Sequence, residues 1–575
     1  MFFILFLQQI SFAQQNNTSN EKMNPLVDES VFINLNSTTF VNGETLYYKL
    51  NCLKNSDKKP STVSKVAYVE LIDSDKKVVF RNKLFLENGS GDGDYFIPST
   101  LKTGNYKLIG YTNWMLNLSV AEIFQTDLSI INPFQEGNLN SKTQNATQVT
   151  SENQATTDFD HLKNTIVTSE NIKLILDKKT FNNREIVNLK IESLKPILKN
   201  GNYAISVRKI DSLPLKKQIS AVNFSKEFKS QSSKSITTLP ELRGEIISGK
   251  ITSKSAENSI QNISVALSMP GNSYISKVVK TNSDGSFIFN IDKIAPSSNM
   301  IVQVLNDNHK NYTVLLNDPL QPKYQELSIE PAPNLNPQIE NSLEQRTIAT
   351  QIENAYYNVK KDSTLTPQKI NPFYSPVATE YILDDFTRFP TLKETIVEIV
   401  KEMYFIQKDR NMFMYVRDMN IVAQSTEPPL IVIDGLFIQD QNELFDYKME
   451  NVYKISVIAG PYFMGPKNFN GLVSFTTKNK DYVTSQAGSY IVDTTILKPN
   501  LQKKYYHPSY SESSLNERIP DYRYQLLWNP ELNLNENSTP ISFYTSDIKG
   551  TFEINIEGFT NEGVPISLSE NIEVQ

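Results

Sequence analysis

The feature that most constrains the fold is a repeated pattern of short runs rich in β-branched and aromatic residues, separated by turn residues. Runs such as Leu46–Leu50 and Ala67–Ile72 alternate with turn pairs such as Asn42-Gly43 and Gly104-Asn105. Val, Ile, Tyr and Phe favour strands, whereas Asn and Gly favour the tight turns that join them. We therefore predict a mainly β fold built from several small sandwiches.

Composition sets the number of domains and excludes several classes of function. The chain has 575 residues, which predicts about four domains. Its hydrophobic content of 39% is enough for several cores, and its net charge of −6 argues against nucleic acid as a partner. A single Cys excludes a disulfide framework, a Cys-based zinc site and an iron–sulfur cluster.

The N-terminus has the pattern of an export signal. Phe2–Leu7 is an apolar run, and Ser11-Phe12-Ala13 offers small residues before a cleavage point at Gln14. A buried N-terminal strand is the alternative, although the polar stretch that follows disfavours it. No Cys follows the run for a lipid anchor, and no later segment reaches the ~20 apolar residues of a membrane helix. We expect a signal peptide at 1–13 and a soluble, exported mature chain.

Changes in residue composition and hydrophobic pattern along the chain suggest the domain boundaries. Residues 134–168 are rich in Asn, Gln, Ser and Thr and nearly lack aromatics, which predicts a linker. After Glu380 the pattern changes, because Thr391 and Glu394 form a capping box before a helix whose apolar positions recur at helical spacing. The expected units are β-sandwiches at 28–133, 169–240 and 241–330, a linker at 331–379, an α+β domain at 380–485 and a β domain at 486–575.

Two of the sandwiches resemble known families. Tyr68–Asp73, Leu101–Tyr106 and Gly110–Met115 resemble the macroglobulin-type immunoglobulin-like domains of exported Bacteroidetes proteins. Leu242–Lys250, with the hairpin at Asp284–Phe287, is similar to a carboxypeptidase regulatory-like domain. These resemblances imply tandem immunoglobulin-like sandwiches in an exported multidomain protein.

The α+β segment resembles the plug domain of TonB-dependent outer-membrane receptors. Pro429–Gly435, Tyr453–Gly460 and Asn470–Lys478 match the family's strands and turns, with Asp434, Gly435, Gly460 and Gly471 as the motif residues. Asp418 follows Arg417 where transporters usually have Arg-Gly. Only 95 residues (575 minus 480) follow Lys480, whereas a receptor barrel needs roughly 200 or more. The final segment resembles the C-terminal domain of the same exported proteins. The resemblance thus implies a plug-like fold without its own barrel.

Candidate reactive residues have simpler explanations. Cys52 follows a strand and is not in the Cys-Gly-Glu-Gln motif of a thioester, so we expect it to pack as an apolar residue. A zinc site needs about three ligands, but the three His are scattered over different predicted units: His161, His309 and His507. Asn282 and Asp284 predict a hairpin turn better than a calcium site.

Further patterns also favour structural roles. Asp384-Asp385 is expected to be a solvated pair, and the apolar face of the helix from Leu392 to Met403 is expected to pack on its own domain. We therefore predict no catalytic, cofactor-binding or metal-binding residue, no cofactor and no enzymatic activity.

Three functions remain open: the first two depend on binding, and the third is enzyme-related, a protease partner or inhibitor of the macroglobulin kind. The first is a non-catalytic periplasmic scaffold that binds outer-membrane β-barrel machinery, such as an assembly or secretion complex or a TonB-dependent transporter, and meets the membrane only through such partners. Open strand edges would serve this role. The second is a glycan- or polymer-binding module, and the third is a protease-related macroglobulin-like protein. An aromatic platform for the second could consist of Tyr505, Tyr506, Tyr522, Tyr524 and Trp528.

Overall fold

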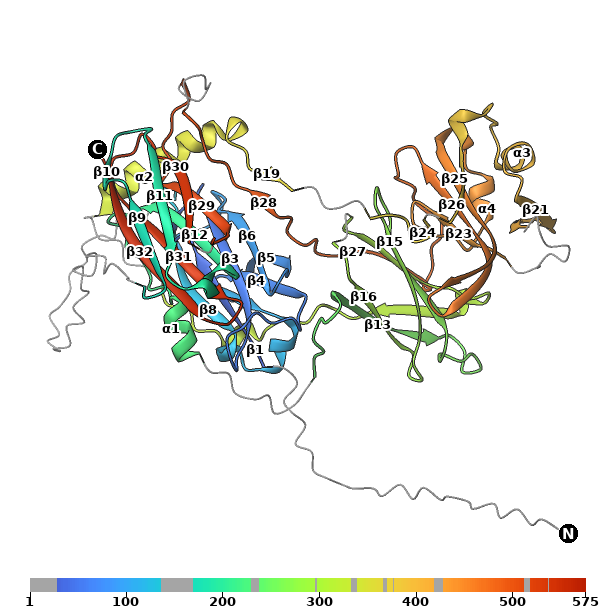
Figure 1. Ribbon diagram of the computed structural model, residues 1–575. Helices are drawn as coiled ribbons and strands as arrows, with labels where there is room; N and C mark the ends of the chain where they lie inside the picture. The colour runs from blue at the N-terminus through green and yellow to red at the C-terminus, as the bar shows by residue number, and fades with distance from the viewer. Residues whose placement is uncertain are drawn as a thin grey trace, which may run out of the picture.

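The computed structural model describes residues 28–135, 169–228, 237–294, 297–331, 339–365, 370–375, 377–417, 428–510, 518–535 and 537–575. The predicted signal peptide, most of the predicted linker at 134–168, His161 and Asp418 lie outside these ranges. The described chain is mostly β and consists of many small sheets, as predicted. Figure 1 shows these sheets gathered into two lobes, which we call the terminal lobe and the central lobe.

The first sandwich is contiguous in sequence and lies in the terminal lobe. One sheet has the order β1-β3-β6 and the other β2-β8-β7-β4-β5. Between them lies an apolar core that includes Phe32, Leu50 and Leu108, all fully buried. Its strands are β1 (Glu29–Leu35), β2 (Thr39–Val41), β3 (Thr45–Lys54), β4 (Val66–Ile72), β5 (Val78–Phe85), β6 (Ser90–Phe96), β7 (Gly104–Tyr111) and β8 (Phe124–Ile131).

The second sandwich combines two segments that are far apart in sequence. Its sheets are β30-β11-β9 and β10-β32-β31-β12-β29, so strands of the predicted domain at 169–240 pair with strands of the predicted domain at 486–575. The sequence predicts two separate domains here, whereas neither segment alone supplies two covering sheets. The strands are β9 (Ile172–Leu176), β10 (Thr180–Phe181), β11 (Ile186–Ser193), β12 (Gly201–Lys209), β29 (Gln525–Leu532), β30 (Ser538–Tyr544), β31 (Gly550–Thr560) and β32 (Pro565–Val574).

The third sandwich belongs to the central lobe and also borrows a strand. Its sheets are β16-β13-β18 and β15-β14-β17-β27. The last strand comes from the predicted C-terminal domain and pairs antiparallel with β17. The strands are β13 (Glu245–Ser253), β14 (Ser264–Met269), β15 (Ile275–Lys280), β16 (Ser286–Ile291), β17 (Asn299–Val304), β18 (Tyr312–Leu316) and β27 (Ile491–Thr495).

The α+β domain completes the central lobe. Its sheet has the order β20-β25-β26-β23-β24. Thr391 accepts a hydrogen bond from the backbone N–H of Glu394 and caps α3 in the predicted capping box. The helix ends earlier than the apolar repeat, since Met403 begins a strand, but Leu392, Ile396 and Met403 all pack in this domain's core. The elements are β20 (Thr379–Ile382), α3 (Leu392–Glu398), β21 (Met403–Lys408), β22 (Asn411–Val416), β23 (Leu430–Ile433), β24 (Leu436–Phe437), α4 (Asn442–Phe445), β25 (Val452–Met464) and β26 (Lys467–Thr477).

The chain passes between the two lobes four times, as the order of elements and Figure 1 show. It leaves the terminal lobe after α1 (Ala221–Glu227) and returns after β18. It leaves again after β19 (Ser363–Thr364) and returns finally after β27, where β28 (Lys503–Lys504) pairs with β19. The lobes are therefore interwoven, and the predicted series of consecutive domains is replaced by two bodies that share four connections.

The predicted linker at 331–379 contains a helix, α2 (Glu340–Ala355), that packs on the terminal lobe. Arg346 anchors it, because its buried guanidinium bonds both carboxylate oxygens of Glu44 at 2.8 Å and Asp211 at 3.1 Å. The helix has a narrow apolar face and buries an ion pair instead, which explains why the hydrophobic pattern did not reveal it.

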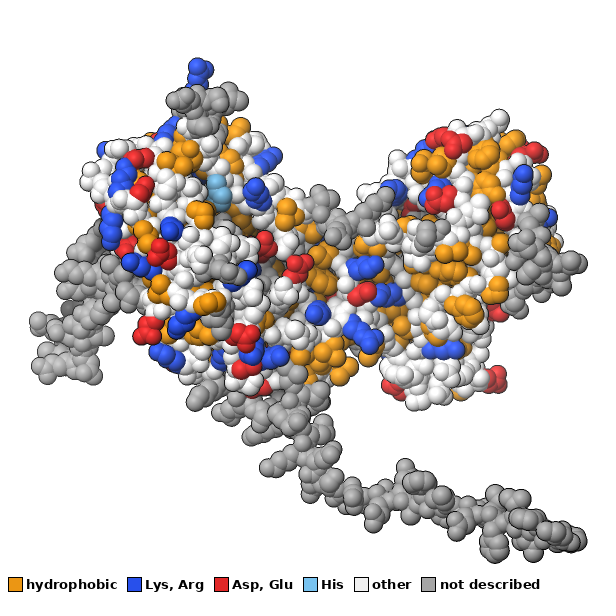
Figure 2. Space-filling model, viewed as in Figure 1, with side chains coloured by type: hydrophobic (Ala, Val, Ile, Leu, Met, Phe, Trp, Pro, Cys, Tyr) orange, Lys and Arg blue, Asp and Glu red, His pale blue; other side chains and the backbone are white. Residues whose placement is uncertain are grey.

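The two lobes differ in their surface composition. Figure 2 shows acidic and basic side chains mixed over both lobes, and hydrophobic side chains gathered in larger areas over the central lobe. Within the described residues, no helix combines the length and the apolar character that crossing a membrane requires.

Candidate functional site

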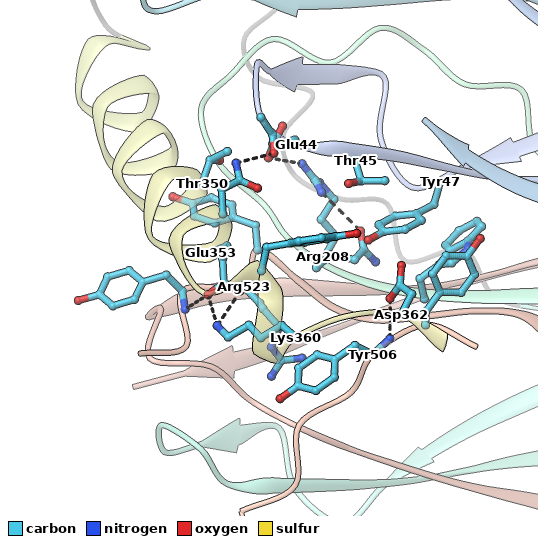
Figure 3. Close-up of a pocket in the computed structure, with 18 of the residues that line it drawn as sticks. Glu44, Thr45, Tyr47, Arg208, Thr350, Glu353, Lys360, Asp362, Tyr506 and Arg523 are labelled. Carbon is cyan, nitrogen blue, oxygen red and sulfur yellow. Dashed lines mark hydrogen bonds and ion pairs between the residues drawn. The ribbon is translucent and has the colours of Figure 1, made fainter. Parts of the chain in front are cut away.

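A pocket of about 190 Å³ lies where α2 meets both sandwiches of the terminal lobe. Its walls come from β3, β12, β29, α2 and the segment after β28, as Figure 3 shows. All five residues of the predicted aromatic platform line it, although they come from two stretches of the chain: Tyr505, Tyr506, Tyr522, Tyr524 and Trp528. The structure thus brings the predicted aromatic residues together.

Three of these aromatic rings are almost completely buried against neighbouring side chains. Trp528, Tyr505 and Tyr524 are only 2%, 6% and 7% exposed. The ring of Tyr47 stacks on Trp528 at 5.9 Å between centroids and meets Tyr505 edge-on at 5.0 Å. Core packing therefore explains much of the cluster, and the partly exposed rings of Tyr506 and Tyr522 remain for a ligand.

The polar residues of the pocket are arranged in pairs. Arg208 bonds Glu44 at 3.0 Å, and Lys360 bonds Glu353 at 2.7 Å. Burial alone would raise the pKa of Glu44, but Arg346 and Arg208 together lower it below its ordinary value. The sequence did not suggest these residues, because their spacing carries no motif and only the fold brings them together.

One carboxylate in the pocket has spare hydrogen-bonding capacity. Asp362 accepts the backbone N–H of Tyr506 at 2.8 Å through Oδ1, and a carboxylate has further acceptor sites. Burial raises its pKa above the ordinary value. Figure 3 shows Asp362 and Tyr506 on one side of the pocket and Glu353 and Lys360 on another. Aromatic surface beside paired charges and an acceptor suits an uncharged, hydroxyl-bearing ligand.

The plug-like motif residues form a turn and a bulge in the α+β domain. Asp434 and Gly435 have φ of 48° and 87° in the tight turn between β23 and β24. Gly460 and Gly471 lie where the register of β25 and β26 shifts, with φ of 90° and 100°. The Asp434 carboxylate accepts the N–H of Thr477 at 2.9 Å, and burial raises its pKa. The turn packs on the third sandwich, so these residues have clear structural roles.

The other candidate residues also occupy ordinary structural positions. Cys52 is fully buried in β3, where burial and the neighbouring Glu29 raise the pKa of its thiol. His309 bonds the backbone oxygen of Asn306 through Nδ1 at 2.8 Å, whereas His507 is exposed and lines the terminal-lobe pocket described above. In the part of the chain that the structure describes, no three His, Cys, Asp or Glu side chains form a possible metal cluster.

The acidic motifs likewise follow their simpler interpretations. Asp284 accepts the backbone N–H of Ser286 at 3.2 Å within a turn in which Gly285 has a φ of 83°. Asp384 is exposed and pairs with Arg388, four residues on, at 2.5 Å. Neither group belongs to a cavity that could organise a reaction among the described residues.

A second candidate site lies at an open seam of the third sandwich. β15 and β16 are edge strands of different sheets, and a groove of about 570 Å³ runs between them. Lys277 and Asp292 form an ion pair at 2.7 Å in this groove, and Ile288 is 41% exposed beside it. Edge strands carry unpaired backbone N–H and C=O groups, so the seam offers a place where another strand could pair.

Comparison with known proteins gives little further information. No family model matches the chain, and no curated protein matches it. It is similar to elastase-activated alpha-2-macroglobulin from Escherichia coli, with 8% identity, a TM-score of 0.24, and coverage of 95% of this chain and 44% of that one. It is also similar to methylamine-reacted alpha-2-macroglobulin from Salmonella, with 10% identity, a TM-score of 0.23, and coverage of 95% of this chain and 39% of that one. The chain spans less than half of these proteins, and such low TM-scores establish neither a shared fold nor a shared function.

Proposed function

We propose that this chain is a non-catalytic, exported scaffold that binds outer-membrane β-barrel machinery from the periplasmic side. Its partner would be a barrel protein or a complex that assembles, secretes through or transports through barrels. The observation that carries this proposal is the open seam between β15 and β16. A partner that exposes a β-strand could extend either sheet by backbone hydrogen bonds.

The chemistry of the seam supports strand binding. Val279 and Ile288 supply apolar surface along the groove, and the pair of Lys277 and Asp292 supplies charge of both signs. A groove of this kind can take alternate side chains of an added strand, while the strand's backbone pairs with the open edge. Gly465, at the tip of the β25–β26 hairpin, also lines the groove and lies against the backbone of Val278. This places the α+β domain directly beside the proposed docking strand.

The interwoven lobes suit a scaffold that holds partners at a fixed distance. Four chain connections join the lobes, and both sandwiches of the terminal lobe share aromatic packing, with Phe32 and Phe559 at 5.4 Å. A body held in this way can present the seam at one end and the terminal lobe at the other.

A pull-down from detergent-solubilised cell envelopes tests this proposal. We expect the tagged chain to recover a β-barrel protein, and Ile288→Lys to abolish that recovery by placing a charge on the open edge. Leu315→Lys is the matched control, because Leu315 is 53% exposed on β18 at the other edge of the same sheet. Recovery of the chain alone, or equal loss with both variants, would count against the proposal.

A second candidate function, glycan or polymer binding, is favoured by the convergence of the five aromatic residues on one pocket. Asp362 would accept ligand hydroxyl groups, and the ring of Tyr506 would pack against the ligand. We expect Asp362→Ala and Tyr506→Ala to abolish binding on a glycan array, with Tyr453→Ala on the other lobe as the control, since Tyr453 is 40% exposed. An array on which the unaltered chain binds nothing would remove this candidate.

A further inference from the structure

A buried lysine and a carboxylate meet where the first chain connection joins the two lobes. Lys83 of β5 belongs to the first sandwich, and Glu245 begins β13 of the third sandwich. Lys83 Nζ lies 2.6 Å from Oε1 of Glu245, with the side chains only 1% and 12% exposed. Among the described residues, Nζ has no hydrogen-bond partner in normal geometry. A buried ammonium in such a position requires an explanation.

A second carboxyl group lies beside this pair. Glu241 is fully buried, its Oε1 accepts the backbone N–H of Ile246 at 3.1 Å, and the hydroxyl of Tyr68 lies 3.4 Å from both of its oxygens. Burial, with a smaller contribution from Glu245, raises the pKa of Glu241 to about 8, although the Ile246 N–H, Lys83 and Tyr68 oppose the shift. At neutral pH this carboxyl is therefore mostly protonated and can donate a proton.

We propose that Lys83 and Glu245 condense to an amide bond, with Glu241 as the acid–base group, which adds a covalent cross-link between the two lobes to the four chain connections. A buried ion pair loses the hydration of both charges, whereas an amide is neutral and needs only hydrogen bonds. The same enclosure that makes the ion pair costly excludes the water that would otherwise solvate the reacting groups.

The reaction needs no cofactor and no oxidant. A proton first moves from the Lys83 ammonium to the Glu245 carboxylate within the ion pair, which gives an amine and a carboxylic acid. Nζ then attacks Cδ of Glu245 and forms the C–N bond. Glu241 gives its proton to the departing hydroxyl group and takes one from nitrogen, which restores its protonated form. The C–O bond breaks and one water molecule leaves.

The rest of the chain provides an internal comparison. Lys107 and Asp127 lie at the same separation, 2.6 Å, but their side chains are 10% and 31% exposed. Water therefore stabilises the charged forms of this pair, and we expect it to remain an ion pair. The contrast assigns the reaction to enclosure and to the neighbouring acid rather than to short distance alone.

The mass of the purified full-length chain tests the proposal directly. We expect the denatured protein to be lighter by one water molecule than its sequence requires, and tryptic digestion to give one branched peptide containing both Lys83 and Glu245. A full mass with separate linear peptides would overturn the proposal, whatever any variant does. A branched peptide at Lys107 and Asp127 would contradict the assigned role of enclosure.

Two variants separate the chemistry from the folding. Glu241→Gln keeps the shape of the protonated carboxyl but cannot transfer its proton, so we expect a folded chain that keeps its full mass. Lys107→Met should still lose one water. If Glu241→Gln is folded, as judged by its circular dichroism, and is still lighter by one water, Glu241 is not the acid–base group and the proposal fails in that part.

Discussion

The first and second sandwiches have the same architecture but opposite relations to the sequence. All eight strands of the first lie within Glu29–Ile131, whereas the second takes half of its strands from before β13 and half from after β28. Each buries an apolar core of similar residue types. The buried face and the turns of a short β segment can be predicted from its own residues. Its partner strand cannot, because that strand can lie more than three hundred residues away.

The largest expected effect is the loss of one sandwich and the survival of the other. Ending the chain after Pro520 removes β29 to β32 and leaves β12 without either neighbour. We expect limited proteolysis to cleave this truncated chain throughout 172–209 and to spare 29–131. Protection of 172–209 in the truncated chain would mean that the second sandwich does not need its C-terminal half.

Arg346 tests how the two sandwiches are held together. It bonds Glu44 of the first and Asp211, which follows the last strand of the second sandwich's N-terminal half. Arg346→Met would remove the arginine that pairs with buried Asp211 and would leave Glu44 paired with Arg208 alone. We expect it to lower the free energy of unfolding by about 3–5 kcal/mol in urea denaturation. Lys323→Met is the control, since the side chains of Lys323 and its partner Glu326 are 82% and 50% exposed, and should cost less than about 1 kcal/mol.

Part of the pH dependence of unfolding should come from the second sandwich. Burial raises the pKa of Glu557 to about 7, although the N–H of Ala221 and the hydroxyl of Ser567 oppose this shift. The folded chain thus holds this proton more tightly than the unfolded chain, so stability is highest below pH 4.5 and falls as the pH rises to about 7. The loss should be on the order of 3 kcal/mol.

Glu557→Gln mimics the protonated carboxyl and should remove this part of the pH dependence. Denaturation curves at several pH values, followed by hydrogen exchange in β31 and β32, would show it. An unchanged slope in the variant would mean that another group is responsible.

The smallest effect concerns the bulge of the α+β domain. A Cβ on Gly471 would lie 2.7 Å from the backbone oxygen of Ile458, and its φ of 100° disfavours any side chain. We expect Gly471→Ala to lower the free energy of unfolding of this domain by roughly 1–3 kcal/mol. Gly104→Ala in the first sandwich is the control, because its Cβ would meet only Tyr106 at an ordinary 3.7 Å.

Features that depend on neighbouring residues could be predicted from the sequence, whereas features that depend on distant residues could not. The capping box at Thr391, the Asp284-Gly285 turn and the mainly β character depend on neighbouring residues, and they were predicted correctly. The pairing of β12 with β31 and the insertion of β27 depend on long-range register, which alternation cannot specify. The helix α2 was missed because a buried arginine anchors it.

The same reasoning applies to the candidate sites. The aromatic residues of the pocket could be named from the sequence, since large rings are conspicuous, but their mutual packing could not. Arg208, Lys360 and Asp362 carry no local signal and meet only through the fold. The seam between β15 and β16 required knowledge of which strands lie at sheet edges.

Native-state hydrogen exchange of the full chain in low concentrations of denaturant most directly tests whether distant segments form one unit. We expect the amides of β11 and β12 to open with the same free energy and the same denaturant dependence as those of β30 and β31. If β30 and β31 opened well before β11 and β12 lost their protection, the second sandwich would not be one cooperative body, and the interwoven scaffold would be contradicted.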